Sequence, residues 1–393
     1  MIERSITEVL REAAIHYPVV TVTGPRQAGK TTLCTMTFDD MPHVSLEPLD
    51  VREQALEDPR GFLDEYKSGA VIDEVQHAPG LLSYLQEEVD KRPDPGRFIL
   101  TGSQHFGLVE SITQSLAGRT AMLTLFPPSL DELMRFDDPP GDLFETLWTG
   151  AYPRIHHRGI PAERWLGDYV TTYVQRDVRQ ALRVMDLNAF SDFLRLCAGR
   201  SAQVLNLSSL GGDAGISHNT ARSWLSVLEA SYLFQRIPAW HRNLRKQTTK
   251  APKLHMIDSG LLCHLLGIHS PDQLRHHPLR GSIFESWVVS EVLKSRTNRG
   301  LPASLFHFRD AKGLEVDLVL EGKNALGFTE VKSGATVTTD YFRPLNRIEK
   351  RVLADEQLAG PLVKRLVYGG EKSTSSRGIE IVSWRQVAEQ DWV

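Results

Sequence analysis

The sequence predicts an α/β fold with a parallel sheet in its N-terminal third. Two short apolar runs, residues 70–74 and 97–103, end in polar side chains, as buried parallel strands commonly do. A third β-rich run, residues 19–23, leads directly into a glycine-containing loop. The stretch between the first two runs, residues 81–90, is amphipathic. Strand and helix therefore alternate as a doubly wound sheet requires.

Length and residue pattern divide the chain into three parts. At about 150 residues per domain, 393 residues predict two or three domains. Strand signals give way to helical patterns at about residue 146, and strand candidates return at about residue 301. We predict a first α/β domain over 1–145, a helical domain over 146–275 and a second α/β domain over 276–393.

The formal net charge of −4 hides an asymmetry along the chain. Residues 1–150 hold 12 basic and 25 acidic side chains, 151–280 hold 17 and 9, and 281–393 hold 16 and 15. The composition, 41% hydrophobic and 24% charged, excludes a disordered chain, a collagen and a coiled-coil rod. The basic excess in the middle indicates a polyanionic partner, and we expect double-stranded DNA.

The chain shows no sign of export or membrane insertion. The N-terminal segment carries Glu3, Glu8 and Glu12 among its apolar residues, which is unlike a signal peptide. No apolar run approaches the 18 residues expected of a membrane-spanning helix. Three widely spaced cysteines make neither a disulfide framework nor a zinc spacing. We therefore expect a protein of the reducing cytoplasm without a membrane partner.

Residues 24–31 fit the phosphate-binding pattern G-x-x-x-x-G-K-[ST]. Its glycines let backbone N–H groups surround phosphates, Lys30 neutralises the β/γ charge and the Thr31 hydroxyl binds Mg²⁺. A strand before the loop and a helix after it supply the context that the pattern needs. ATP and Mg²⁺ are the predicted cofactors. The predicted nucleotide-binding residues are Gly24, Arg26, Gln27, Ala28, Gly29, Lys30, Thr31, Thr32, Asp73 and Ser103.

Two acidic residues, Asp73 and Glu74, close the apolar run over residues 70–74. Asp73 is expected to hold the magnesium ion through water, while Glu74 polarises the attacking water. Thr101 and Ser103 follow the next strand and are expected to face the same crevice, where a hydroxyl can sense the γ-phosphate. The alternative is a glycine turn with a surface acidic pair.

Arg119 is a candidate for the arginine that neutralises transition-state charge. It would act either within its own chain or on a neighbouring subunit of a homo-oligomer. The alternative is a solvated surface arginine, which is the commoner role for a single arginine.

The middle part contains a helix-turn-helix pattern over residues 208–222. Ser217 is placed to cap the second helix, whose outward residues suit contacts with phosphates and bases. These outward residues are His218, Asn219, Arg222 and Ser223. The following stretch, residues 236–257, has six basic and no acidic side chains and is interpreted as the basic wing of a winged helix. The alternative is a packing or protein-interaction module.

Near the C-terminus, residues 315–320 and 325–332 predict the two strands of a hairpin. Glu330 and Lys332, two residues apart, project from one face, and the other strand can bring Asp317 beside them. This arrangement resembles restriction-endonuclease-like nucleases, in which carboxylates hold Mg²⁺ and the lysine orients or activates water. Glu285, on a helix upstream, is the candidate third acidic ligand. Acidic residues and lysines are also common at strand edges.

Taken together, the motifs resemble a group of prokaryotic AAA-family ATPases. These proteins have an N-terminal P-loop domain, a winged-helix segment and a C-terminal domain of unknown function with a restriction-endonuclease-like fold. The segments that carry the resemblance are GPRQAGKTTL, AVIDEVQHAPGLL, FILTGSQHFGL, SLAGRTAMLTLFPPSLDEL, KLHMIDSGLLCHLLG, GSIFESWVV, EVDLVLE and FTEVKSG. The resemblance implies ATP and Mg²⁺ at the glycine loop and a nuclease-like site that includes Glu285, Asp317, Glu330 and Lys332.

The leading hypothesis is an ATP-binding and ATP-hydrolysing protein that engages DNA and carries a nuclease-like, Mg²⁺-dependent site. The rival is an ATP-gated switch whose C-terminal domain is catalytically silent and binds a protein. A third hypothesis is a DNA-binding regulator without hydrolysis. A C-terminal site plugged by its own side chains would favour the switch.

Overall fold

The computed structural model describes residues 1–103, 112, 114–174, 186–240, 251–322, 325–353 and 361–392, which form two compact units. The first unit consists of Met1–Pro128, Ala230–Tyr232 and Thr297–Leu301. The second consists of Ser129–Glu229, Leu233–Arg296 and Pro302–Val393. The predicted division between residues 275 and 276 falls inside the second unit and stays a prediction.

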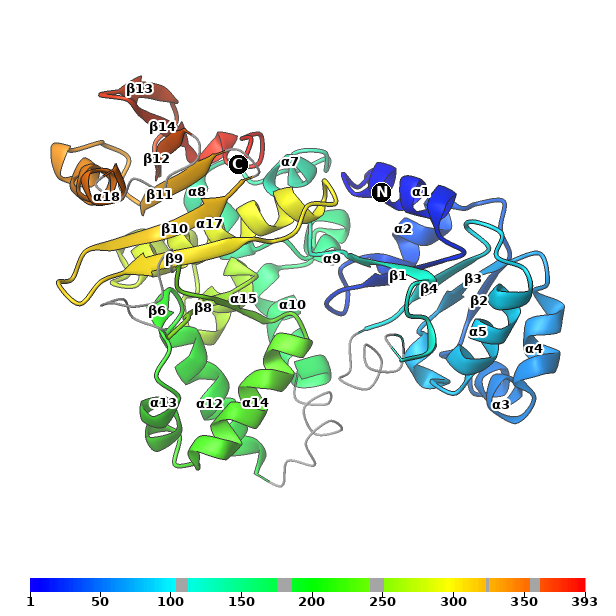
Figure 1. The fold of residues 1–393 in the computed structure, drawn as a ribbon. Helices are drawn as coiled ribbons and strands as arrows, with labels where there is room; N and C mark the ends of the chain where they lie inside the picture. The colour runs from blue at the N-terminus through cyan, green and yellow to red at the C-terminus, as the bar shows by residue number, and fades with distance from the viewer. Residues whose placement is uncertain are drawn as a thin grey trace. The chain divides into compact units, whose positions relative to one another are not determined.

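A five-stranded parallel sheet is the frame of the first unit (Figure 1). Its strand order is β2-β3-β4-β1-β5. The strands are β1 (Val19–Thr23), β2 (His43–Ser45), β3 (Ala70–Asp73), β4 (Phe98–Thr101) and β5 (Thr120–Thr124). The parallel sheet confirms the predicted α/β class of this part. Sequence patterns missed β2 and β5 because one has three residues and the other is only partly buried.

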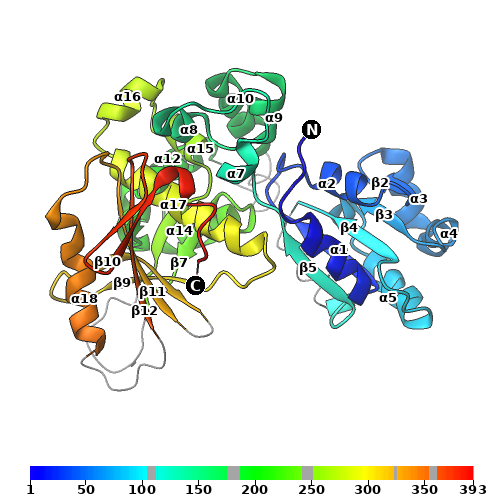
Figure 2. The ribbon, with the colours of Figure 1, turned by 90° about the horizontal axis from the view of Figure 1, so that it is seen from above.

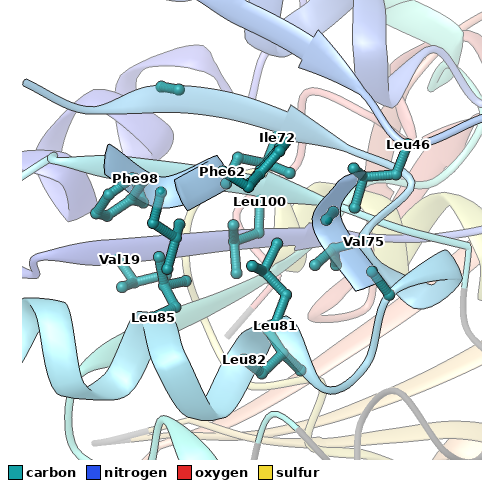
Figure 3. Packing of buried hydrophobic residues seen from close by; sticks show 14 of the residues in the cluster. Val19, Leu46, Phe62, Ile72, Val75, Leu81, Leu82, Leu85, Phe98 and Leu100 are labelled. Atoms are coloured by element: carbon teal, nitrogen blue, oxygen red, sulfur yellow. The ribbon is translucent and has the colours of Figure 1, made fainter. Parts of the chain in front are cut away.

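Helices cover this sheet. They are α1 (Thr7–His16), α2 (Lys30–Thr37), α3 (Leu49–Glu57), α4 (Pro59–Glu65), α5 (Leu81–Lys91) and a short 3-10 helix, Val75–His77. Leu81, Leu82 and Leu85 of α5 belong to the core cluster that includes Phe98 and Leu100 of β4 (Figure 3). Full burial of such side chains contributes about 1.5–3 kcal/mol each. This packing fixes the carboxyl ends of the strands, where the polar residues begin.

The first part of the second unit contains a series of helices and a small sheet. The helices are α7 (Leu130–Leu133), α8 (Leu143–Thr149), α9 (Pro153–Arg158), α10 (Ala162–Tyr169), a π-helix (Val170–Val174), α12 (Leu187–Gly199), α13 (Leu207–Asp213), α14 (His218–Ala230), α15 (Ser259–Leu265) and α16 (Pro271–His276). The small sheet is antiparallel, with the order β6-β8-β7. Its strands are β6 (Gln203–Val204), β7 (Phe234–Ile237) and β8 (Lys253–Met256).

The rest of the second unit is built on a mixed six-stranded sheet of order β13-β14-β12-β11-β10-β9. Its strands are β9 (Leu305–Arg309), β10 (Glu315–Glu321), β11 (Leu326–Lys332), β12 (Leu362–Tyr368), β13 (Thr374–Ser376) and β14 (Ile379–Ser383). The helical segments are α17 (Arg280–Thr297), α18 (Arg343–Leu353) and two 3-10 helices, Thr339–Phe342 and Trp384–Gln386. The α18 and α17 helices lie along opposite faces of the sheet (Figure 2). The predicted hairpin is confirmed by the antiparallel pairing of β10 with β11.

Some expectations fall outside the described residues. They include Arg242, Arg245, Lys246 and Lys250 of the predicted basic wing and the later part of the long helical pattern that begins near residue 163. Within the described part of the chain, no helix combines the length and the apolar character that a membrane crossing requires.

Candidate functional site

The glycine loop joins the end of β1 to the start of α2, as the sequence predicts. Gly24 has φ = +145°, and a Cβ built there would lie 2.1 Å from the Leu125 carbonyl oxygen, so a larger residue is excluded sterically. Gly29, with φ = +95°, is the residue before α2, and that helix end has no side-chain cap. Uncapped N–H groups at a helix N-terminus are suited to an anion.

Lys30, the first residue of α2, is buried. Its Nζ donates to the carbonyl oxygens of Gly24 (3.1 Å) and Pro25 (2.9 Å), so the side chain points back toward the start of the loop. Burial lowers the pKa of Lys30 to about 8, although Glu74 and Asp73 oppose the change. The acidic side chains nearby therefore do not offset the cost of burying this ammonium. A phosphate beside it would supply the missing negative charge.

Thr31 and Asp73 meet beside this lysine. The Thr31 hydroxyl donates to Asp73 Oδ1 over 2.7 Å, and Thr101 at the end of β4 donates to the same oxygen. The Ser45 hydroxyl lies 3.5 Å from Asp73 Oδ2. A carboxylate and a hydroxyl oxygen at one point are the ligand types that Mg²⁺ takes with phosphates. These residues therefore fit the predicted magnesium role.

Glu74 follows Asp73 in a left-handed conformation, with φ = +57°. Its carboxylate accepts hydrogen bonds from Ser103 Oγ (3.2 Å) and from the Gln76 side chain. Burial alone would raise the pKa of Glu74, but Lys30, Gln76 and further polar neighbours together lower it. Glu74 is thus held as a carboxylate, the form that can orient water.

Arg4 is a residue of this site that sequence reasoning missed. From the segment before α1, its guanidinium donates to the carbonyl oxygens of Ala28 in the loop (3.0 Å) and Phe126 after β5 (2.8 Å). It is 8% exposed. No local pattern marks this arginine, because its partners are backbone atoms 24 and 122 residues away.

Of the remaining predicted nucleotide-binding residues, three lie in the loop and one lies on α2. Arg26, Gln27 and Ala28 lie in the loop, and Arg26 adds positive charge that lowers the pKa of both Lys30 and Glu74. Gln27 takes a left-handed conformation, with φ = +65°. Thr32 is exposed on α2.

Arg119 is not brought to the loop within its own chain. It stands immediately before β5, whose first residue pairs with Val19, whereas the loop follows the other end of β1. Its guanidinium forms a two-bond ion pair with Asp90 near the end of α5, with Nη2 donating to Asp90 Oδ2 over 2.9 Å. Action on a neighbouring subunit stays a prediction.

The second helix of the predicted helix-turn-helix is α14. Its inner face is buried, through Ala221, Trp224, Leu225 and Leu228. Ser217 Oγ accepts a hydrogen bond from the Thr220 backbone N–H over 3.1 Å. The predicted outward residues Asn219, Arg222 and Ser223 are exposed, and His218 is half-buried.

The structure brings the predicted C-terminal residues together. Lys332 Nζ donates to Glu330 Oε1 and lies 3.7 Å from Asp317 Oδ2. The Val331 backbone N–H donates to that same Asp317 oxygen over 2.9 Å. Glu285 of α17 belongs to the same group, because Glu285 and Asp317 contact the same cation.

That cation is Lys253 of β8, which sequence reasoning missed. Its Nζ lies 2.8 Å from Glu285 Oε1, 2.6 Å from Glu315 Oε1 and 3.4 Å from Asp317 Oδ1. Among the described residues, no group of three His, Cys, Asp or Glu side chains is disposed to hold a metal ion. In the predicted Mg²⁺ set of Glu285, Asp317 and Glu330, the Lys253 ammonium contacts the first two carboxylates, and the metal role of the set stays a prediction.

Sequence comparisons divide the chain into three matched segments. Residues 16–134 match the family described as an AAA domain. The glycine loop and the five-stranded parallel sheet of the first unit lie within this matched segment. Residues 140–272 and 280–387 match two families described as domains of unknown function, DUF8612 and DUF4143.

Two curated relatives align along most of the chain. They are uncharacterized protein Rv2008c of Mycobacterium tuberculosis and uncharacterized protein Mb2031c of Mycobacterium bovis. Each is 29% identical over 369 residues, which cover 92% of this chain and 79% of the relative.

The chain is also similar to solved structures. The Walker-type ATPase PABY2304 of Pyrococcus abyssi has 14% identity and a TM-score of 0.45, covering 66% of this chain and 94% of that one. AMPPCP-bound DnaA from Aquifex aeolicus has 16% identity and a TM-score of 0.31, covering 57% and 85%.

Proposed function

We propose that this protein binds ATP with Mg²⁺ and hydrolyses it at the loop over residues 24–31. The observation that carries the proposal is the 2.7 Å contact between the Thr31 hydroxyl and Asp73, formed beside the buried Lys30 ammonium. A cation, a hydroxyl and a carboxylate thus converge where α2 begins. Phosphoryl transfer needs this positioning and charge neutralisation more than covalent chemistry.

Binding would use groups that the loop already presents. The N–H groups at the start of α2 and the Lys30 ammonium would contact the phosphates, with the ammonium leaving the carbonyl oxygens of Gly24 and Pro25. Thr31 and Asp73 would hold Mg²⁺, which supplies charge neutralisation at the phosphate oxygens. Arg4 would keep the loop in place through its bond to the Ala28 carbonyl.

Hydrolysis would depend on Glu74 and the hydroxyls at the end of β4. The Glu74 carboxylate would orient the attacking water, and its bond from Ser103 would fix the carboxylate's direction. Thr101 donates to Asp73, and its hydroxyl oxygen accepts the Glu74 backbone N–H over 3.3 Å. One strand end therefore supports both acidic residues.

A replacement of Glu74 tests hydrolysis separately from binding. In Glu74→Gln we expect ATP affinity to be retained and steady-state phosphate release to fall about 100-fold or more, since the charge that orients water is lost. Glu57→Gln, an exposed glutamate on α3, is the matched control and should change neither quantity. Unchanged turnover in Glu74→Gln would contradict the proposed hydrolytic role.

DNA engagement is a second candidate function, supported by the exposed surface of α14. Asn219, Arg222 and Ser223 are exposed along the second helix of a helix-turn-helix arrangement, and β7 and β8 follow it as the two strands of a wing would. If α14 contacts duplex DNA, Arg222→Ala should weaken binding of a fluorescent duplex and reduce its salt dependence. Equal binding by Arg222→Ala and the wild type would remove α14 from this role.

For the C-terminal region, the contacts support the switch rather than the nuclease. Lys253 pairs with Glu315 and with Glu285 and Asp317 of the predicted cleavage site, so an ammonium of the same unit occupies two of the predicted metal-binding carboxylates. We therefore infer that ATP turnover controls an interaction made by a catalytically silent C-terminal region. Duplex cleavage that requires Mn²⁺ and disappears in Asp317→Asn would contradict this.

A further inference from the structure

Lys253 lies among three carboxylates and is 1% exposed. One carboxylate, Glu285, comes from α17, and the others, Glu315 and Asp317, come from β10. The ammonium donates hydrogen bonds to Glu285 (2.8 Å) and Asp317 (3.4 Å) and forms an ion pair with Glu315 at 2.6 Å. These contacts place Lys253 inside a cluster, called here the lysine-filled cluster, that is formed by Lys253, Glu285, Glu315, Asp317, Glu330 and Lys332.

The position of Lys253 is fixed by its backbone. It lies in the central strand of the β6-β8-β7 sheet, paired with Val204 on one side and Ile237 on the other. Two residues earlier, the Ala251 carbonyl oxygen contacts His307 Nε2 of β9 at 3.1 Å. Pairing on both sides of β8 fixes the backbone of Lys253. The side chain therefore extends toward the carboxylates from a well-defined position.

The cluster holds more carboxyl groups than ammonium groups. Its four carboxylates face two ammonium groups, those of Lys253 and Lys332. Burial, with a further contribution from Asp317, raises the pKa values of Glu285 and Glu330 to about 8. Glu330 is 5% exposed, and its Oε2 has no hydrogen-bond partner among the described residues. The raised pKa values favour the protonated forms of Glu285 and Glu330 at neutral pH.

A divalent ion and the Lys253 ammonium would compete for one position. Mg²⁺ requires oxygen ligands at about 2.1 Å in near-octahedral geometry. The Oε1 of Glu285, the Oε1 of Glu315 and the Oδ1 of Asp317 already surround Nζ, so these oxygens serve either the ammonium or a metal. The second lysine differs, because Lys332 is about one-third exposed and contacts Glu330 and Asp317 from the outer side.

We propose that Lys253 is the resident cation of the lysine-filled cluster: it occupies the place of a divalent metal ion, and its removal creates a divalent-cation site. The wild-type cluster then joins β8 to α17 and β10 and binds no metal. This proposal is independent of ATP binding by the first unit.

The test is a titration of the nucleotide-free full chain with Mn²⁺, followed by electron paramagnetic resonance. We compare the wild type, Asp317→Asn, Lys253→Ala, the double variant Lys253→Ala/Asp317→Asn, and Lys332→Ala. Lys253→Ala should bind one Mn²⁺ at least about tenfold more tightly than the wild type, and the double variant should lose this gain. Lys332→Ala, which removes the outer ammonium and leaves Lys253, should gain none.

Two results would overturn the proposal. The first is a wild-type Mn²⁺ site that Asp317→Asn abolishes, since it would show that Lys253 does not fill the cluster. The second is a new site in Lys332→Ala and none in Lys253→Ala, which would assign the cation role to Lys332. If Lys253→Ala fails to fold, the wild type and Asp317→Asn still decide, because the proposal requires that they bind Mn²⁺ equally.

Discussion

The loop of the first unit and the lysine-filled cluster of the second both place a buried lysine near acidic side chains, with opposite consequences. Among the described residues, the Lys30 ammonium donates hydrogen bonds to backbone carbonyl oxygens alone, and burial lowers its pKa. Burial by itself would also lower the pKa of Lys253, but Glu285, Asp317 and Glu315 outweigh it and raise that pKa. A buried lysine whose charge is not offset by acidic side chains is suited to bind an anion. A lysine surrounded by carboxylates already has its counter-charges and has a structural role.

The acidic residues show the same contrast. Asp73 and Glu74 accept hydrogen bonds mainly from hydroxyl and amide groups, which Mg²⁺ and water can replace or join. Glu285, Glu315 and Asp317 instead share contacts with one ammonium. The presence of carboxylates and a lysine is therefore not enough to predict a ligand site, because the partner of each charge decides.

The largest expected effect comes from removing the lysine of the loop. Lys30→Ala should lower ATP turnover by about 10²- to 10³-fold and weaken ATP binding, because the positive charge at the phosphates is lost. Phosphate release and titration with a fluorescent ATP analogue measure the two quantities. Lys67→Ala, which changes an exposed lysine of the same unit, should match the wild type. Normal ATP binding by Lys30→Ala would remove the functional difference between the two lysines.

Removing Lys253 should instead destabilise the protein. Lys253→Met leaves buried carboxylates without their cation, and breaking a buried ion pair in this way costs about 3–5 kcal/mol. Urea unfolding should show this loss in the transition of the second unit. Lys312→Met, at an exposed site of the same unit, serves as the control. A stability equal to the wild type would mean that Lys253 is not needed to balance the cluster.

The pH dependence of stability should report the raised pKa of Glu330 in the cluster. Burial and Asp317 raise the pKa of Glu330 to about 8, above its ordinary value of 4.5, with Glu285 adding to the rise and Lys332 opposing it. A raised pKa means that the folded state holds the proton more tightly, so the stabilisation is full below about pH 4.5 and is lost as pH rises through 8. Glu330→Gln lacks this proton, so its melting temperature should fall less than that of the wild type between pH 5 and 8.

Glu389→Gln, an exposed replacement, should follow the wild-type pH profile. A Glu330→Gln profile parallel to the wild type would show that Glu330 ionises normally in the folded protein.

Arg4 should have a smaller effect on the loop. Arg4→Ala removes two hydrogen bonds to backbone carbonyls and should weaken ATP binding by about five- to tenfold, since the loop is less well positioned. Arg11→Ala, which changes a half-exposed arginine paired with Glu8, is the control. Calorimetric titration with ATP distinguishes the two variants, and equal affinities would contradict the positioning role of Arg4.

The smallest effect is expected for Arg119. Its partner Asp90 lies on the protein surface, and such ion pairs contribute little. At protein concentrations where the chain is monomeric, Arg119→Ala should keep turnover within about twofold of the wild type. A large loss in the monomer would contradict its placement away from the loop, and a loss confined to associated copies would support the neighbouring-subunit hypothesis.

The sequence predicted features that depend on neighbours along the chain. The loop needs Gly24, Gly29 and Lys30 at fixed spacing, and the hairpin needs two alternating runs around a turn, so both could be recognised. Asp73 and Ser103 could be placed because carboxyl ends of parallel strands meet at one edge of a sheet.

The residues that were missed depend on distant partners. Arg4 reaches carbonyl groups that any residue could offer, and Lys253 lies 32 residues before Glu285 and 64 before Asp317. The basic count along 236–257 placed Lys253 in the predicted basic wing instead. Its burial follows from the packing of β8 against α17 and β10, which no local pattern encodes.

The most direct test is the number of Mn²⁺ ions bound by the wild-type chain with and without ATP, measured by electron paramagnetic resonance. We predict one tightly bound Mn²⁺ per chain with ATP and none without it, with the ATP-dependent ion lost in Lys30→Ala. An ion that binds without ATP and disappears in Asp317→Asn would contradict the lysine-filled cluster, and the absence of any ATP-dependent ion would contradict the nucleotide site.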